Sequence, residues 1–257
     1  MKGNIKTSAD IEKMRAGGKR LARIVRLVGE AVQPGVSTVT LNELAERLIR
    51  EGGDEPSLLG YTPTGAPRPY PAAICISVND EVVHGIPNED PKILREGDIV
   101  GLDCVLTHQG RMTDTAITVP VGSIDAKAQK LIAVTREALN VGIQAAHAGN
   151  HVGDIGHAIE TFVKPHGYGI VYELCGHGVG YAVHEAPQVP NVGTPKTGVK
   201  LRSGMVLALE PMLNAGAPEV KLSSDGYTFS TVDGSLSAHF EHTILITDKA
   251  PEILTVE

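Results

Sequence analysis

The feature that most constrains the fold of this chain is an internal repeat with a period of 114 residues. A helix start, an apolar helix face and a terminating glycine occur in the same order in residues 35–53 and 149–167. The superposed positions are Gly35 and Gly149, Thr40 and Asp154, Leu41 and Ile155, Leu44 and Ala158, Leu48 and Phe162, Ile49 and Val163, and Gly53 and Gly167. Chance similarity is the alternative, because amphipathic helices resemble one another. We interpret the repeat as two related halves, about residues 8–120 and 124–248, with a shared sheet and a ligand site between them.

Local patterns predict the elements of each half. Thr7 and Asp10 form a capping box ahead of a first helix, and a second helix is predicted to begin at Thr40 and to end at Gly52-Gly53. A Pro/Gly-rich stretch, 59–71, indicates a long surface loop of the kind that is often functional. Strands are predicted for 72–78, 99–106 and 112–119, and a long helix runs from about 124 to 147. We expect one α/β domain (α+β type), residues 1–257, with no N-terminal extension domain.

Composition narrows the class of protein. The 257 residues are 42% hydrophobic and carry a net charge of −7, which argues against a nucleic-acid partner. No apolar run is long enough to cross a bilayer, and no apolar segment follows the first lysines as in a signal peptide. The three cysteines form no C-x-x-C pair and support neither a disulfide framework nor a zinc ribbon. We therefore expect a cytoplasmic protein with no membrane partner.

Two aspartates lie in neighbouring apolar, strand-like segments. Asp103 follows Ile99-Val100-Gly101-Leu102, and Asp114 lies in Met112-Thr113-Asp114-Thr115. If the intervening turn centres on His108-Gln109, the two carboxylates face each other directly, which destabilises a sheet unless a cation lies between them. The alternative is a different register, with one aspartate as a strand-end cap.

Further ligand candidates follow in the second half. His177 and His184 lie in one glycine-rich segment, where the backbone can come close to a ligand. Glu210 and Glu241 each lie in an apolar strand context, where an unpaired charge is costly. With Asp103 and Asp114 they give four carboxylates and an imidazole, a set that suits two divalent ions and metal-assisted hydrolysis.

These residues, in this order, resemble the type I methionine aminopeptidases from about residue 8 to residue 248. The matching motifs are Ile76-Ser77-Val78-Asn79, His84-Gly85-Ile86-Pro87, the two aspartate segments, Gly176-His177-Gly178, His184-Glu185-Ala186-Pro187, Glu210-Pro211-Met212 and Glu241-His242-Thr243. The resemblance implies the pita-bread fold, with two pseudo-symmetric halves around a curved antiparallel sheet. It also implies removal of the initiator methionine from nascent proteins with a small second residue.

The resemblance implies a role for each site residue. Asp103 would chelate one metal, Asp114 and Glu241 would bridge both, and His177 and Glu210 would complete the ligands of the second metal. A bridging hydroxide would attack the carbonyl, with Glu210 as the proton-transfer group. His184 would stabilise the tetrahedral intermediate, and His84 would contact the substrate near the scissile bond. The ions would be Co, Mn, Fe or Zn, and Ser237 with the backbone near Asn79 matches a region that holds a monovalent cation in relatives.

The side-chain pocket departs from the family pattern. Tyr70 and Cys75 match two of its members, but Val183 stands where relatives often have Phe, and Tyr227 where many have Trp. The loop of residues 61–68 is also longer than usual. A methionine thioether is flexible and polarisable, so an altered apolar pocket can still hold it.

Two other functions compete with this interpretation. A proline-directed aminopeptidase or prolidase would share fold and metals, but Glu210-Pro211-Met212 and Phe240-Glu241-His242 favour the methionine branch. A metal-free binding module should lack at least one ligand, and all five are present. The substrate partners would be nascent polypeptide N-termini, with any contact to the ribosome made by the domain surface, and we expect a monomer.

The sequence makes one prediction about the protein itself. Methionine aminopeptidases require a small second residue, and Lys2 is large. The hypothesis is that this protein retains its own Met1, and an intact mass lacking one methionine would refute it.

Overall fold

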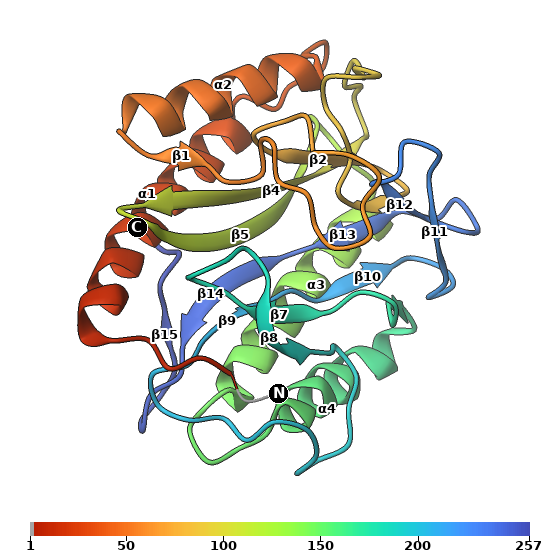
Figure 1. Ribbon diagram of the computed structural model, residues 1–257. Coiled ribbons are helices and arrows are strands. Elements are labelled where there is room, and N and C mark those ends of the chain that lie inside the picture. Colours follow the sequence, from red (N-terminus) through yellow and green to blue (C-terminus); the bar gives the residue numbers. More distant parts are fainter. Residues whose placement is uncertain (1–2) are drawn as a thin grey trace.

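A nine-stranded antiparallel sheet forms the centre of the computed structural model, which describes residues 3–257 (Figure 1). Met1 and Lys2, which bear on the retention of Met1, lie outside the described residues. The strand order is β1-β4-β5-β14-β9-β7-β8, with β2 paired to β4 and β15 to β14. The strands of this sheet are β1 (Glu55–Pro56), β2 (Cys75–Val78), β4 (Ile99–His108), β5 (Arg111–Pro120), β7 (Gly176–Gly178), β8 (Glu185–Val189), β9 (Val206–Leu209), β14 (Glu241–Leu245) and β15 (Glu252–Ile253).

Two small three-stranded sheets flank the large one. They have the orders β13-β10-β6 and β11-β12-β3. Their strands are β3 (Glu81–Val83), β6 (Gly169–Ile170), β10 (Met212–Asn214), β11 (Val220–Leu222), β12 (Phe229–Thr231) and β13 (Ser237–His239). All the strand pairings are antiparallel, as expected from the sequence.

Four α-helices pack against these sheets. They are α1 (Ser8–Glu30), α2 (Thr38–Glu51), α3 (Ala126–Ala145) and α4 (Val152–Val163), and a 3₁₀ turn, η1 (Lys164–His166), follows α4. Helix α1 packs on β4 and β5, and α3 packs on β9, β13 and β14, behind the sheet in the view of Figure 1. No helix within residues 3–257 is both long and apolar enough to cross a membrane.

The helices follow the predicted local signals with one exception. The capping box of Thr7 and Asp10 is present, and the buried face of α1 includes Leu21, Val25 and Val28. The predicted start of α2 at Thr40 was wrong, because this helix begins at Thr38. The Thr38 hydroxyl donates to the Pro87 carbonyl at 2.8 Å and accepts from the Lys92 amide at 3.0 Å, and such long-range contacts leave no local signal.

The 114-residue period holds for the helices but not for the strands. Helix α2 begins at Thr38 and α4 begins at Val152, one period later. Strands β4 and β5 are joined by a two-residue turn, whereas β10 to β13 lie between β9 and β14. The apolar core reflects the same arrangement: one buried cluster comes from residues 21–121, and another comes from residues 128–246 together with Ile99.

Candidate active site

The β4–β5 hairpin sets the positions of the two aspartates. Its turn is formed by Gln109 and Gly110, both with positive φ (49° and 74°), as a two-residue hairpin turn of the primed kind requires. Asp103 is therefore opposite Ala116, and Asp114 is opposite Val105. The predicted direct pairing of the aspartates was wrong, because the turn lies one residue after the predicted His108-Gln109. They are instead diagonal neighbours on the same face of the sheet, still close enough to interact.

Strand order brings the other predicted ligands to the same place. His177 comes from β7, Glu210 follows directly after β9, and Glu241 begins β14, which lies between β5 and β9. All five predicted ligands line one cavity of about 220 Å³. The residues from the two halves of the sequence thus meet near the centre of the sheet.

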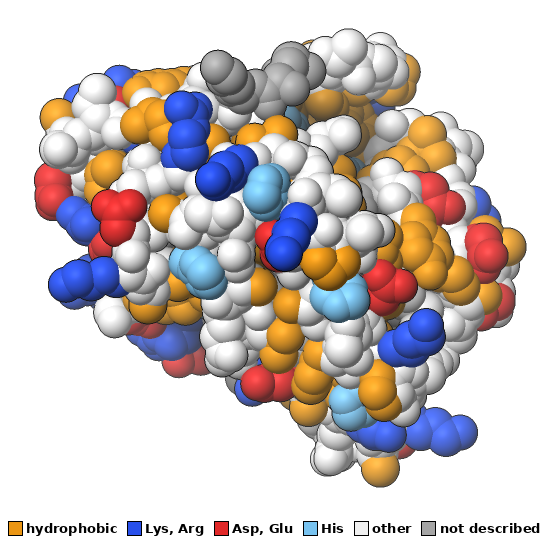
Figure 2. Space-filling view, turned by 90° about the horizontal axis from the view of Figure 1, so that it is seen from below, with side chains coloured by type: hydrophobic (Ala, Val, Ile, Leu, Met, Phe, Trp, Pro, Cys, Tyr) orange, Lys and Arg blue, Asp and Glu red, His pale blue; other side chains and the backbone are white. Residues whose placement is uncertain are grey.

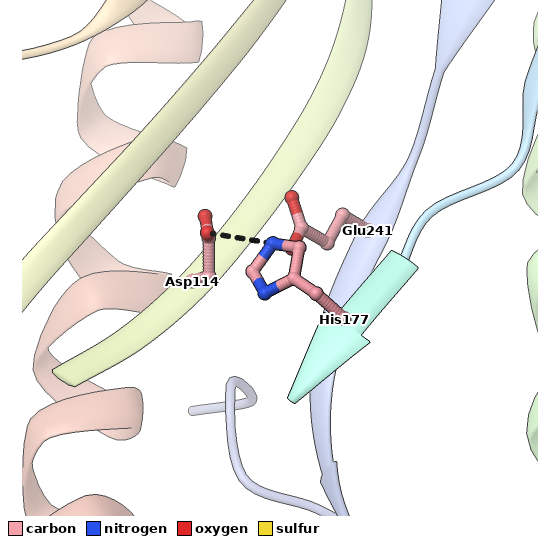
Figure 3. Close-up of side chains that lie close together, drawn as sticks. All are labelled: Asp114, His177 and Glu241. Atoms are coloured by element: carbon pink, nitrogen blue, oxygen red, sulfur yellow. Dashed lines mark ion pairs between the residues drawn. The ribbon is translucent and has the colours of Figure 1, made fainter. Parts of the chain in front are cut away.

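The ligand atoms lie close enough together to bind the same metal ion. His177 Nε2 is 3.4 Å from Glu210 Oε1 and 3.8 Å from Asp114 Oδ2. One ligand atom each of Asp114, His177 and Glu241 lies within 4.8 Å of the other two. Figure 3 shows these three side chains converging from β5, β7 and β14.

Burial changes the proton affinity of the whole cluster. Burial, and to a lesser degree the neighbouring carboxylates, raise the pKa values of Asp114, Glu210 and Glu241 well above their usual range. Burial raises the pKa of Asp103 to about 7 and lowers that of His177 to about 3. Four carboxylates so close together cannot all ionise without a compensating positive charge.

Unpaired polar atoms indicate where that charge would lie. Asp114 Oδ1 and Glu241 Oε1 are buried and have no hydrogen-bond partner within residues 3–257. A buried carboxylate oxygen without a partner is costly, and coordination to a divalent ion satisfies it. The donor set therefore fits metal ions, with carboxylate oxygens and one imidazole nitrogen as ligands.

The two other predicted histidines also line the cavity. The rings of His184 and His177 are 4.4 Å apart between centroids, and burial lowers the pKa of His184. His84 is half-buried, and desolvation by the surrounding protein, then the nearby His184, lower its pKa to about 4. Both imidazoles are thus neutral at physiological pH.

The predicted side-chain pocket divides into lining residues and supporting residues. Cys75 and Val183 line the cavity. Tyr70 and Tyr227 are not among its lining residues; they belong to the apolar cluster behind Cys75 and Val183, with their rings edge to face at 5.1 Å. Tyr70 donates to the Gly85 carbonyl at 2.8 Å, and Tyr227 donates to the Arg68 carbonyl.

Several site residues were not anticipated. His239 Nε2 is 4.0 Å from Glu210 and 3.9 Å from Glu241, and it is buried without a hydrogen-bond partner. Its position two residues before Glu241 in an extended segment was the available signal, because alternate residues share a face. The Tyr61 hydroxyl is 2.8 Å from His184 Nδ1, a contact between distant segments that no local pattern reveals. Glu173, Leu174 and Cys175 complete one wall of the cavity.

The region matched to a monovalent cation is well hydrogen-bonded. The Ser237 amide donates to the Asn79 carbonyl at 2.9 Å, and the Ser237 hydroxyl donates to Asn214 Oδ1 at 2.9 Å. Asn79 itself has a positive φ of 59°. A cation in this region stays a prediction.

A larger groove adjoins the cavity. Its volume is about 930 Å³, and it shares Cys175, His177 and His184 with the cavity. Residues of β8, including Pro187 and Gln188, form one side, and Thr64 of the long loop forms another. The surface is hollowed near the top of the view in Figure 2.

Comparison with known proteins agrees with this geometry. The model of metallopeptidase family M24 matches residues 12–248. The chain belongs to this family. As a member of M24 it is a metallopeptidase, which accounts for buried carboxylates without protein partners.

The following three similar proteins are named methionine aminopeptidases. A methionine aminopeptidase of Clostridium acetobutylicum is 44% identical over 98% of both chains. Methionine aminopeptidase 1 of Bacillus subtilis is 43% identical over 97% of this chain and 98% of its own. A crystal structure of methionine aminopeptidase from Thermotoga maritima has a TM-score of 0.94 and 43% identity, covering 99% of this chain and 100% of its own. The resemblance found in the motifs is thereby confirmed.

More distant M24 structures share the fold alone. Prolidase from Pyrococcus furiosus has a TM-score of 0.76 with 23% identity, and this chain covers 65% of it. Together with the Thermotoga structure, this likeness confirms the expected pita-bread fold.

Proposed function

We propose that this M24 metallopeptidase removes the N-terminal methionine from nascent proteins whose second residue is small. The observation that supports the proposal is the single cavity in which four carboxylates and His177 meet, with His84 and His184 on the same walls. The names of relatives at 43–44% identity agree with this substrate. We further propose that it acts as a monomer, in the cytoplasm, on chains that emerge from the ribosome.

The metals would be held by the residues that sequence motifs indicate. Asp103, Asp114 and Glu241 would hold one ion, and Asp114, His177, Glu210 and Glu241 the other. Two divalent ions, when bound, supply a hydroxide near neutral pH and polarise the scissile carbonyl.

Glu210 is the proposed proton carrier. Its carboxyl group lies in the cavity, 3.4 Å from His177, and as a metal ligand it would be ionised and able to accept a proton. A carboxyl of that kind can take a proton from the attacking water and deliver it to the leaving amine nitrogen. The amine then departs neutral, which completes cleavage of the peptide bond.

His184 is the proposed oxyanion donor, and Tyr61 fixes its tautomer. The neutral imidazole carries one proton, and we propose that Nδ1 accepts from the Tyr61 hydroxyl across the 2.8 Å contact. The proton then resides on Nε2, from which it can stabilise the developing oxyanion. His84, which lines the same cavity, would bind the substrate near the scissile bond.

The side-chain pocket is proposed to take methionine. Cys75 and Val183, together with Leu58 and Val105, give the cavity an apolar wall, backed by Tyr70 and Tyr227. Such a wall suits an unbranched thioether, which adapts to irregular apolar space.

A peptide panel tests this function. Protein stripped with a chelator and reloaded with Mn or Co would be offered peptides that begin Met-Ala, Met-Gly, Met-Lys, Leu-Ala and Ala-Pro. We expect metal-dependent release of methionine from the Met-Ala and Met-Gly peptides alone. Cleavage of Ala-Pro would favour a proline-directed enzyme, equal cleavage of Leu-Ala a broader aminopeptidase, and no cleavage with any metal a binding module.

A further inference from the structure

A buried ion pair ties the N-terminal segment to the strand that follows His184. Lys6 Nζ lies 2.7 Å from Glu185 Oε2, and the two side chains are 1% and 6% exposed. Asn4 Nδ2 donates to the same oxygen at 2.5 Å. A buried Lys–Glu pair is weak evidence for stability, because desolvation offsets much of the attraction. Stability alone therefore does not explain why this ion pair lies beside the active site.

The second oxygen of Glu185 holds the loop that precedes His184. Glu185 Oε1 accepts from the Ala182 amide at 3.1 Å and from the Tyr181 amide. These two hydrogen bonds make residues 181–185 a closed turn. Val183 and His184, both of which line the active-site cavity, lie inside that closed segment.

The same loop is fixed at its outer end to helix α1. The Tyr181 hydroxyl donates to Asp10 Oδ2 at 2.8 Å, and Arg111 Nε donates to Asp10 Oδ1 at 2.6 Å. Lys6 Nζ also lies 4.1 Å from the centroid of the Tyr181 ring. The Lys6 backbone is itself anchored, because its amide donates to the Gly204 carbonyl at 2.8 Å.

We propose that Glu185, held by Lys6, is a positioning residue that sets the orientation of His184 toward the scissile carbonyl. The inference rests on the proposed function, in which His184 stabilises the oxyanion. Glu185 lines the adjoining groove but not the cavity that contains the metal ligands, so we expect its effect on the reaction to pass through His184. Tyr61 contacts the His184 ring, and Glu185 restrains the backbone just before His184 through the Tyr181 and Ala182 amides.

The test compares Glu185→Ala in two backgrounds. In the otherwise unchanged enzyme loaded with Mn, we expect Glu185→Ala to lower kcat for a Met-Ala peptide by about 10- to 100-fold, the scale of a small misplacement of a catalytic group. In a His184→Ala background the same change should have almost no further effect, because the group it positions is gone. An equal loss in both backgrounds would overturn the proposal and indicate a general structural role.

Two further measurements keep the test decisive. Glu185→Ala leaves Lys6 buried without its partner, so the double variant Lys6→Met/Glu185→Leu removes both charges and should fold while showing the same loss of kcat. Hydrogen exchange of the Tyr181 and Ala182 amides should accelerate in both variants, whether or not the protein cleaves peptides. Unchanged protection of these amides would refute the inference, whereas an inactive wild type with accelerated exchange in the variants would count against the proposed function alone.

A matched control is available at another contact of α1. Arg15 of α1 pairs with Glu252 of β15 through two hydrogen bonds of 2.6 and 2.7 Å, and neither residue lines the cavity. Glu252→Gln should leave kcat and the exchange of residues 181–182 unchanged. A loss like that of Glu185→Ala would show that any broken contact of α1 lowers activity, which contradicts a specific role for Glu185.

Discussion

At the scale of single residues, burial shifts the pKa values of the groups that form the active site. Carboxylates there hold protons more tightly, and imidazoles less tightly, than they do in water. The four carboxylate ligands were predictable because each charged side chain interrupts an apolar strand, and His177 was predictable because it lies in a glycine-rich segment. His239 was missed although it stands two residues before Glu241, and Tyr61 was missed because its contact with His184 joins segments far apart in the chain.

Substitutions of His184 and Tyr61 should lower kcat by different amounts. His184→Ala should lower kcat by about 10²- to 10³-fold, as loss of an oxyanion donor does in other hydrolases. Tyr61→Phe removes one hydrogen bond and keeps the ring, so its effect should be roughly two- to tenfold. Steady-state kinetics with a Met-Ala peptide would check both, and an equal loss from the two variants would contradict the assigned roles.

The metal-free site gives a pH-dependent prediction. The carboxylates of the cluster have raised pKa values in the folded state, so the stability they contribute is full at low pH and is lost as pH rises through those values. Burial lowers the pKa values of His177 and His239 to about 3, so their contribution is lost as pH falls below about 6.5. Above about pH 7.5 these histidines are neutral in both states, so their contribution no longer changes and the carboxylate effect remains.

We therefore expect the Tm of chelated protein to fall between about pH 7.5 and 9. Metal-loaded protein should show a much smaller fall, because the ligand carboxylates are already ionised when they bind metal. Thermal unfolding across this range, with and without Mn, would check the prediction. A Tm of the chelated protein that rises with pH would contradict it.

At the scale of elements, helix α1 is fitted closely to the C-terminal residues. A Cβ on Gly18 would lie 2.3 Å from the Leu254 carbonyl oxygen, whereas a Cβ on Gly29 would meet side-chain atoms, the nearest being the end of Ile117 at 3.3 Å. The helix itself was predictable from its capping box and apolar spacing. The need for glycine at one position and not at the other depends on which strands pack against it.

These two glycines form a matched pair. Gly18→Ala should destabilise the protein by about 1–3 kcal/mol, because the neighbouring backbone cannot move aside easily. Gly29→Ala gains up to about 1 kcal/mol of helix propensity against a contact that a flexible side chain can relieve, so its effect should be small or stabilising. Urea denaturation would distinguish them, and equal effects would contradict the packing described for α1.

The hairpin register shows where element prediction failed. The Asp103 and Asp114 strands were identified correctly, but their pairing depended on which two residues form the turn. Gln109 adopts a positive φ that its residue type does not favour, and this concealed the turn although Gly110 suits its second position. The diagonal arrangement that results still places both carboxylates in one cavity.

At the scale of the whole molecule, the site exists because strands from both parts of the chain meet in one sheet. Strand β5 pairs with β14, and β14 pairs with β9, so ligands 127 residues apart in sequence, Asp114 and Glu241, lie together. The internal repeat predicted this convergence. The inserted strands β10 to β13, which alter the spacing in the second part, left no signal in the helical repeat.

The most direct test of the central claim is a metal titration that is followed by mass and by activity together. Chelated protein would receive increasing Mn, with bound metal counted by native mass spectrometry and methionine release measured from a Met-Ala peptide. The account predicts up to two ions per chain, activity that appears only with bound metal, and loss of bound metal in Glu241→Gln. Full activity in the chelated protein, or unchanged metal binding in Glu241→Gln, would contradict it.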